Sequence, residues 1–206
     1  MNAEDVSNWK KYTDSLLIDC KKFMECNKKF GRGFIGELLV FQTLLRTYSD
    51  ELLKNGNEIK YFGASNPDYD ILLKLGNREF KINAKETNVL DTNKNPKWIR
   101  QKASKFVVNP NSSDATVRID GDKNLFYVYV NVTTWKDNDF VQFFVISEPD
   151  AMNVFGNNYI NSRKRKDFAA RKNNSDDMWV LYENIKQYED KNLDLFKKIL
   201  ILKKWN

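Results

Sequence analysis

The residues best suited to chemistry lie in the stretch 66–87, NPDYDILLKLGNREFKINAKET, which combines carboxylates, an amide and lysines. Apolar and polar residues alternate on either side of Gly76-Asn77, a pattern typical of a β-hairpin with a two-residue turn. Such a turn places Asp70 opposite Asn83, and cross-strand partners share one face of a hairpin. The alternation therefore predicts which polar side chains meet.

The two faces of this predicted hairpin differ in character. One face is apolar and consists of Tyr69, Ile71, Leu73, Phe80, Ile82 and Ala84. The other face gathers Asp68, Asp70, Asn83 and Lys85 at the open end. A carboxylate, an amide oxygen and an ammonium group at one strand end suggest a divalent-metal site with a lysine beside it. The alternative is a solvated strand face with alternating charges.

The composition excludes several classes of site. Histidine is absent, so Ser-His-Asp and Cys-His hydrolases and histidine-metal nucleases are excluded as they are usually built. Hydrolytic chemistry would have to use carboxylates, lysine, tyrosine or a hard metal bound by oxygen. The two cysteines, Cys20 and Cys26, share the first predicted helix, which favours neither a zinc site nor a disulfide framework. Residues 31–36 spell G-x-G-x-x-G, but without a preceding strand the match does not favour nucleotide binding.

The net charge of +6 is concentrated in one segment. Residues 161–172, NSRKRKDFAARK, carry six basic side chains against Asp167, namely Arg163, Lys164, Arg165, Lys166, Arg171 and Lys172. This pattern favours a polyanionic partner, most simply nucleic acid. The alternative is a solvated loop that binds nothing specific. No apolar run approaches the roughly 18 residues of a membrane span, and no signal-peptide core is present, so we expect a cytoplasmic protein without membrane contacts.

The remaining pattern predicts a single α/β (α+β) domain over residues 1–206 with a mixed sheet of about five strands flanked by helices. We expect an N-terminal helical extension (1–30), a core (31–147), and a C-terminal basic loop and helix (148–206). Helices are predicted at 4–26, 34–53, 148–159 and 183–203, and strands at 58–62, 125–132 and 140–147 as well as in the hairpin. Residues 88–96 are expected to form a polar, mobile segment.

Glu37 lies in the first turn or so of the second predicted helix, among hydrophobic neighbours. A favourable interaction with the helix N-terminus is one explanation for it. The functional alternative is a metal ligand or a group that organises water.

These motifs together resemble the PD-(D/E)xK nuclease superfamily, which includes type II restriction endonucleases and archaeal-type Holliday junction resolvases. The resemblance rests on residues 33–40 (GFIGELLV), 67–72 (PDYDIL) and 82–87 (INAKET). The family pattern is an acidic residue on the first core helix, an Asp on the second core strand and (D/E/Q)-x-K on the third. The aromatic-rich strand pair, the basic loop and the last helix are similar to small members of the fold, so the likeness extends over roughly residues 31–200.

A second register, Pro67-Asp68 followed by Glu79-Phe80-Lys81, also spells the motif literally. In the predicted hairpin Asp68 lies opposite Lys85, about 20 Å along the strand from Glu79. Those two carboxylates cannot share a metal, whereas Asp70, Asn83 and Lys85 can. The favoured register departs from the family at Asn83, a neutral residue that removes one negative charge and weakens metal binding.

The resemblance implies a DNA endonuclease dependent on Mg²⁺ or Mn²⁺, of the type II restriction class. Asp70, the Asn83 oxygen, the Ala84 carbonyl and Glu37 would hold the metal, and Lys85 would act on the attacking water. Asp70, Lys85 and Glu37 are thus the expected catalytic residues. Double-stranded DNA would be bound by a homodimer through the basic loop 163–172 and through Lys94, Lys97, Arg100 and Lys102.

Three other functions remain open from the sequence. One is a catalytically degenerate nucleic-acid-binding protein on a nuclease-like fold, which Asn83 favours. Another is an enzyme similar to Holliday junction resolvases. The last is a structural or regulatory protein whose basic loop contacts an acidic protein.

Overall fold

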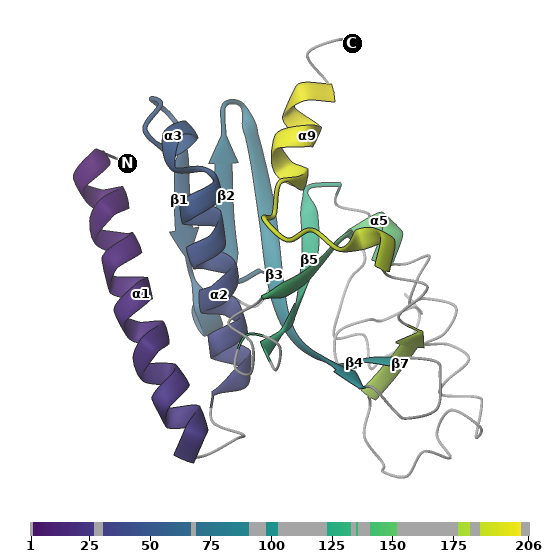
Figure 1. The fold of residues 1–206 in the computed structure, drawn as a ribbon. Helices are drawn as coiled ribbons and strands as arrows, with labels where there is room; N and C mark the ends of the chain where they lie inside the picture. The colour runs from purple at the N-terminus through teal and green to yellow at the C-terminus, as the bar shows by residue number, and fades with distance from the viewer. Residues whose placement is uncertain are drawn as a thin grey trace.

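One long strand, β3 (Arg78–Leu90), organises the fold. Figure 1 shows a computed structural model, which describes residues 2–26, 31–66, 69–90, 98–102, 123–132, 135, 141–151, 177–181 and 186–202. The other strands are β1 (Glu58–Tyr61), β2 (Ile71–Leu75), β4 (Trp98–Lys102), β5 (Leu125–Asn131), β6 (Gln142–Ser147) and β7 (Asp177–Leu181). The helices are α1 (Ala3–Cys26), α2 (Arg32–Thr47), α3 (Ser49–Leu52), α5 (Glu148–Ala151) and α9 (Leu195–Leu202), with 3₁₀ turns at Gly63–Ser65 and Lys186–Tyr188.

Five strands form a mixed sheet in the order β1-β2-β3-β5-β6. Neighbouring strands are antiparallel except for β3 and β5, which run parallel. The expected mixed sheet of about five strands is therefore confirmed. The far end of β3 continues beyond this sheet, because Asn88–Leu90 pair with β4, and β4 pairs with β7. The expectation of a mobile segment from residue 88 onward is wrong at its start, since these main-chain groups pair in a second ladder.

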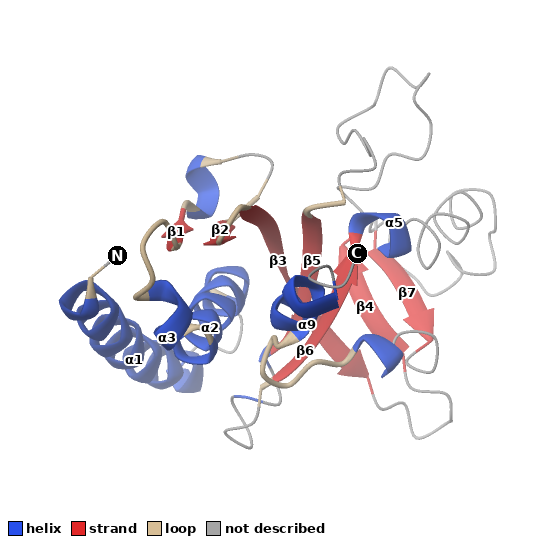
Figure 2. Ribbon diagram, turned by 90° about the horizontal axis from the view of Figure 1, so that it is seen from above, coloured by secondary structure: helices blue, strands red, loops and turns tan. Residues whose placement is uncertain are grey.

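Helices α1, α2 and α9 lie on the same side of the sheet (Figure 2). The apolar hairpin face predicted from the sequence lies toward them: Ile71, Leu73 and Ile82 are fully buried. Helix α2 is apolar around most of its surface because it lies between the sheet and α1. Gly36 brings it close to β5, since a Cβ at this position would lie 3.7 Å from Cβ of Val130.

The C-terminal helix is shorter than expected. It begins only at Leu195, although the sequence pattern predicts a helix from residue 183. Leu193 has a left-handed backbone (φ 55°), and Asp190 accepts hydrogen bonds from the N–H groups of Asp194 and Leu195. A left-handed residue breaks an α-helix, and a carboxylate that accepts the first N–H groups starts a new one.

The other predicted helices keep their positions with altered limits. The helix expected at 4–26 is α1, and the one expected at 34–53 divides at Tyr48 into α2 and α3. Only the first turn of the helix expected at 148–159 falls among the described residues. Among the helices that the structure describes, none combines the length and the apolar character needed to cross a membrane.

Candidate functional site

The hairpin has the register that the sequence predicts. Leu75 pairs with Arg78 and Leu72 pairs with Lys81. One position beyond the last paired residues, the Asp70 N–H donates a hydrogen bond of 2.9 Å to the carbonyl of Ile82. Asp70 therefore lies opposite Asn83, as expected.

The Asp70 carboxylate lies at the start of β2 and is directed toward β3. Its Oδ2 accepts a 2.7 Å hydrogen bond from the Ala84 N–H and lies 3.8 Å from Nζ of Lys85. Asp70 is only 7% exposed, so these two donors offset much of the cost of removing its charge from water. Both contacts use Oδ2, so Oδ1 is the oxygen that they leave for a ligand.

Asn83 and Lys85 project from β3 on the face opposite to α2, because Ile82 and Ala84 between them face the core. Asn83 is buried, whereas the Lys85 side chain keeps 22% of its surface exposed. On the neighbouring strand β5 their partners are Tyr127 and Tyr129. The structure thus brings together a carboxylate, an amide and an ammonium group where β2 begins.

Glu37, on α2, contacts Tyr61, the last residue of β1, whose main chain pairs with Ile71 next to Asp70. The Tyr61 hydroxyl donates a 2.8 Å hydrogen bond to Oε2 of Glu37. Burial raises the pKa of Tyr61 above its usual range, and the hydrogen bond with Glu37 and the charges of Glu37 and Asp70 raise it further. The hydroxyl is therefore hydrogen-bonded to Glu37 and within electrostatic range of Asp70.

The helix N-terminus does not explain Glu37. Helix α2 begins at Arg32, so Glu37 lies in its second turn, and its first turn contains no acidic residue. The helix dipole acts mainly within the first turn. Glu37 instead accepts a hydrogen bond from the Tyr61 hydroxyl.

Sequence reasoning missed the turn after β1. The N–H groups of Phe62 and Gly63 donate to the main-chain carbonyl of Asp70, at 2.8 and 3.3 Å. Gly63 has a left-handed φ of 53°. A glycine shortly after aromatic residues at a strand end is a signal for a tight turn. This signal does not reveal which carboxylate the Tyr61 hydroxyl contacts.

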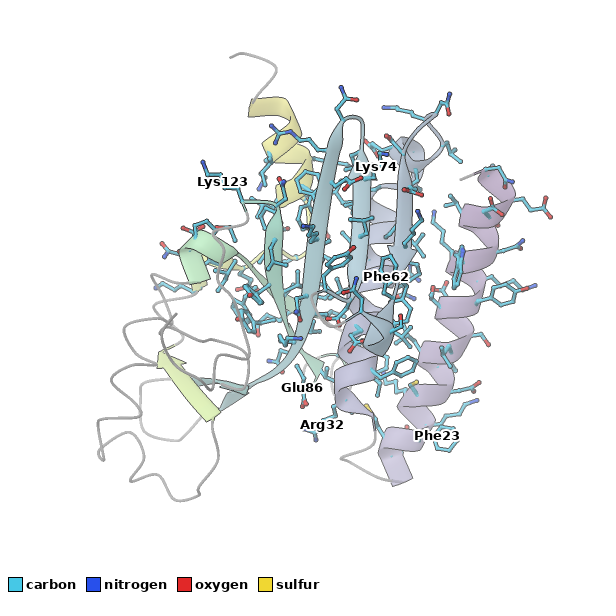
Figure 3. The ribbon with its side chains drawn as sticks, turned by 180° about the vertical axis from the view of Figure 1, so that it is seen from behind. Phe23, Arg32, Phe62, Lys74, Glu86 and Lys123 are labelled. Atoms are coloured by element: carbon cyan, nitrogen blue, oxygen red, sulfur yellow. The ribbon has the colours of Figure 1, made fainter. Side chains whose placement is uncertain are left out.

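A second ion pair at this end of the sheet was also missed. Arg32 at the start of α2 lies 3.5 Å from Glu86 of β3, and Figure 3 shows the two side chains close together. Two glycines of the G-x-G-x-x-G stretch have roles in the fold at this end of α2. Gly31 precedes α2 with a left-handed φ of 52°, and Gly36 packs on β5. The element before them is helix α1, so the described fold gives no support to nucleotide binding.

The oxygen donors suit a hard cation, although the ligand set carries little negative charge. Glu37, Asp70 and Asn83 provide two carboxylates and one amide, and oxygen ligands are those that Mg²⁺ prefers. Within the residues that the structure describes, no three or more acidic, cysteine or histidine side chains form a group that could hold a metal. Asp68 lies outside the described residues.

The predicted nucleic-acid-binding residues are not tested by the fold. Lys94, Lys97 and residues 163–172 lie outside the described residues. Arg100 and Lys102 belong to β4, where only the backbone is described. Their contribution stays a prediction.

Comparison with known proteins adds no relative. No protein-family model matches the chain, no curated protein matches its sequence, and no solved structure matches its fold.

Proposed function

We propose that this chain is a divalent-metal-dependent endonuclease that hydrolyses phosphodiester bonds of double-stranded DNA, in the manner of type II restriction enzymes. The observation that carries the proposal is the Asp70 carboxylate, held by the Ala84 N–H and lying 3.8 Å from the Lys85 ammonium. The hairpin that carries Asp70, Asn83 and Lys85 also has the register that the resemblance to PD-(D/E)xK nucleases requires.

Asp70, Asn83, the Ala84 carbonyl and Glu37 are the groups proposed to hold Mg²⁺ or Mn²⁺. When bound, such a cation polarises the scissile phosphate and lowers the pKa of a bound water. Oδ1 of Asp70 is suited to this purpose because the contacts with Ala84 and Lys85 both use Oδ2. Asn83 contributes an oxygen but no charge.

Lys85 is proposed to orient the attacking water and to stabilise the negative charge that develops on the phosphate. Its ammonium group lies beside Asp70 and is partly exposed, so a phosphate can approach it. The basic segments, with Arg100, Lys102 and residues 163–172, are proposed to bind DNA phosphates without reading sequence. Two copies of the chain would each cut one strand.

Plasmid cleavage by the purified protein tests this proposal, first in Mg²⁺ and then in Mn²⁺. We expect Asp70→Asn and Lys85→Ala to lower cleavage by about 10²-fold or more. Lys74→Ala is the matched control, because Lys74 lies on the same hairpin at the opposite end from Arg32 and Glu86 (Figure 3). If both site variants cut as well as the control, the assignment is wrong.

A second function, nucleic-acid binding without cleavage, is favoured by the neutral Asn83 and by the absence of a three-acid group among the described residues. In that case the protein slows the gel migration of a plasmid or a four-way junction at low salt in EDTA. It cuts neither DNA with any divalent ion. Cleavage of the junction but not of linear duplex would instead indicate a resolvase-like enzyme.

A further inference from the structure

The turn that begins at Tyr61, the last residue of β1, contacts both acidic residues of the candidate site, although neither acidic residue is part of the turn. Tyr61 donates to the Glu37 side chain, and the N–H groups of Phe62 and Gly63 donate to the Asp70 main chain. Glu37 and Asp70 come from different elements, a helix and the start of a strand. We propose that this turn fixes their separation, with Tyr61 as a positioning residue that holds Glu37 where it can share a divalent cation with Asp70. This inference rests on the proposed function.

The position of Tyr61 is itself fixed by the sheet. In the β1–β2 ladder its main chain pairs with Ile71, which directly follows Asp70 in the chain. Its ring packs against Phe41 of α2, with centroids 5.6 Å apart. The hydroxyl therefore has a defined place between α2 and the start of β2, and the Glu37 carboxylate that accepts its hydrogen bond is held there too.

The Asp70 side of the turn is held by main-chain contacts. Two consecutive N–H groups converge on one carbonyl oxygen, at 2.8 and 3.3 Å, so the backbone of Asp70 is tied to the turn by both hydrogen bonds. The carboxylate of the same residue is meanwhile anchored to β3 by the Ala84 N–H. Asp70 is thus held from β1 and from β3 at once.

Gly63 makes room for the tyrosine hydroxyl. A Cβ on Gly63 would lie 3.0 Å from the Tyr61 oxygen, closer than such contacts normally are, and the φ of 53° also disfavours any side chain. Glycine at position 63 therefore lets the turn and the Tyr61 hydroxyl keep their present places without strain.

Two carboxylates that converge on one cation repel each other when the cation is absent. A neutral hydroxyl that donates to one of them stabilises its charge and keeps its direction before the cation arrives. Residues that orient metal ligands in this way change metal affinity by about 10–100-fold when they are removed. Tyr61 has the chemistry for this task, since its hydroxyl is a neutral group that donates to Glu37.

Calorimetric titration of the full chain with Mn²⁺ tests the inference. We expect Tyr61→Phe to weaken Mn²⁺ binding by about 10–100-fold, and excess Mn²⁺ to restore DNA cleavage. The decisive measurement compares Tyr61→Phe in the wild-type chain with Tyr61→Phe in the Glu37→Gln variant. In that background Tyr61→Phe should cause no further loss, because the two residues act through one hydrogen bond.

Two further variants separate positioning from general damage to the fold. Tyr69→Phe removes the hydroxyl of a residue next to Asp70 whose ring packs on Phe62, and it should leave Mn²⁺ affinity unchanged. Gly63→Ala keeps every polar group but crowds the Tyr61 hydroxyl, and it should weaken Mn²⁺ binding in the same direction as Tyr61→Phe. Thermal unfolding of each variant confirms that it is folded at the titration temperature.

The outcomes distinguish the inference from the proposed function. If wild-type protein binds no Mn²⁺, the metal-dependent function and the inference both fail. If wild-type protein binds Mn²⁺ and Tyr61→Phe binds it equally well, the positioning role is wrong while the function stands. The positioning role is also wrong if the loss of affinity in Tyr61→Phe adds fully to the loss in Glu37→Gln.

Discussion

Asn83 limits how strongly the candidate site can hold a cation. It occupies the paired position opposite Asp70 and is almost fully buried, but it carries no charge. Glu37 and Asp70 are then the carboxylates available among the described residues. In the proposed metal site, affinity for the cation therefore depends on whether residue 83, an asparagine with nearly the shape of aspartate, carries a charge.

Asn83→Asp should tighten binding of Mn²⁺ by about tenfold or more, because a third negative charge adds to the ligand set. The variant should also be less stable without metal, since the new carboxylate is buried next to Asp70. Calorimetric titration and thermal unfolding measure the two effects. Asn77→Asp, at the exposed hairpin turn, is the matched control. Unchanged or weaker binding in Asn83→Asp would remove this residue from the metal site.

The sequence predicts the hairpin half of the site because its geometry is local. A two-residue turn at Gly76-Asn77 fixes every pair along the hairpin, including Asp70 with Asn83. Tyr61 could not be predicted in the same way. Its contact with Glu37 depends on how α2 docks on β1, which is a tertiary arrangement that neither segment encodes alone.

At the scale of single elements, the start of α2 depends on two glycines with different backbones. Gly31 precedes the helix in the left-handed region, whereas Gly33 lies inside the helix with open space around its Cα. An L-residue at a left-handed position is strained, while alanine inside a helix is favoured over glycine.

Gly31→Ala should therefore lower the free energy of unfolding by about 1 kcal/mol, and Gly33→Ala should raise it by about 0.5–1 kcal/mol. Urea unfolding followed by circular dichroism measures both. The two substitutions are chemically identical and two positions apart, so each serves as the control for the other. Equal effects of the same sign would contradict the backbone assignment at Gly31.

Tyr48 joins the end of α2 to the C-terminal helix. Its hydroxyl donates to the Leu193 carbonyl at 2.7 Å and accepts from the Lys197 N–H at 3.1 Å. Thr47 adds a contact of the same kind, because its hydroxyl donates to the Asn192 carbonyl at 2.7 Å. The short α9 is thus held to the core by hydrogen bonds as well as by Phe196.

Tyr48→Phe should lower the free energy of unfolding by about 1–3 kcal/mol, because it leaves buried main-chain groups without their partner. Burial raises the pKa of Tyr48 above its usual value of about 10. The folded state therefore keeps the proton that the unfolded state releases, so stability is lost as pH rises above about 10. Tyr48→Phe should make that alkaline decline shallower. Tyr12→Phe, on the exposed surface of α1, should change neither quantity.

The limits of elements were less predictable than their existence. Periodicity indicates a C-terminal helix, but the left-handed Leu193 and the Asp190 contacts that delay its start are not visible in that pattern. The polar residues at 91–96 similarly hide the pairing at the end of β3, because nothing in their pattern shows that Asn88–Leu90 have a partner in β4.

At the scale of the whole molecule, the uneven charge bears on the proposed binding of DNA. The net charge is +6, and the basic segment 161–172 accounts for most of it. Each phosphate contact releases counterions, so binding that depends on such a segment weakens steeply as salt is raised.

DNA affinity in EDTA should therefore fall with salt, and the log–log slope should become shallower by about 3–4 when Arg163, Lys164, Arg165 and Lys166 are all replaced by glutamine. Fluorescence anisotropy with a labelled duplex measures the slope. The control removes the same number of positive charges from elsewhere on the surface, at Lys11, Lys22, Lys54 and Lys60. If the two variants have the same slope, net charge alone governs binding and the segment has no special role.

The sequence predicts the fold class more fully than the connections within it. Alternation identifies the hairpin, and near-continuous runs of aromatic and β-branched residues identify β5 and β6. The parallel pairing of β3 with β5 could not be predicted, because it joins strands that are distant in sequence. The β4–β7 extension depends on a still longer separation.

The shared strand β3 has a consequence for the order in which the protein folds. Its pairing with β2 closes a two-residue turn, whereas its pairing with β5 must wait until a much longer stretch of chain has closed. Short loops close faster than long ones, so we expect the hairpin to form before β5 joins it. In pulse-labelled hydrogen exchange the Ala84 amide, which bonds to the Asp70 carboxylate, should then gain protection before the Val128 amide in β5. The carboxylate that the proposed function assigns to metal binding would thus contribute earlier, during folding, by pairing with the strand beside it.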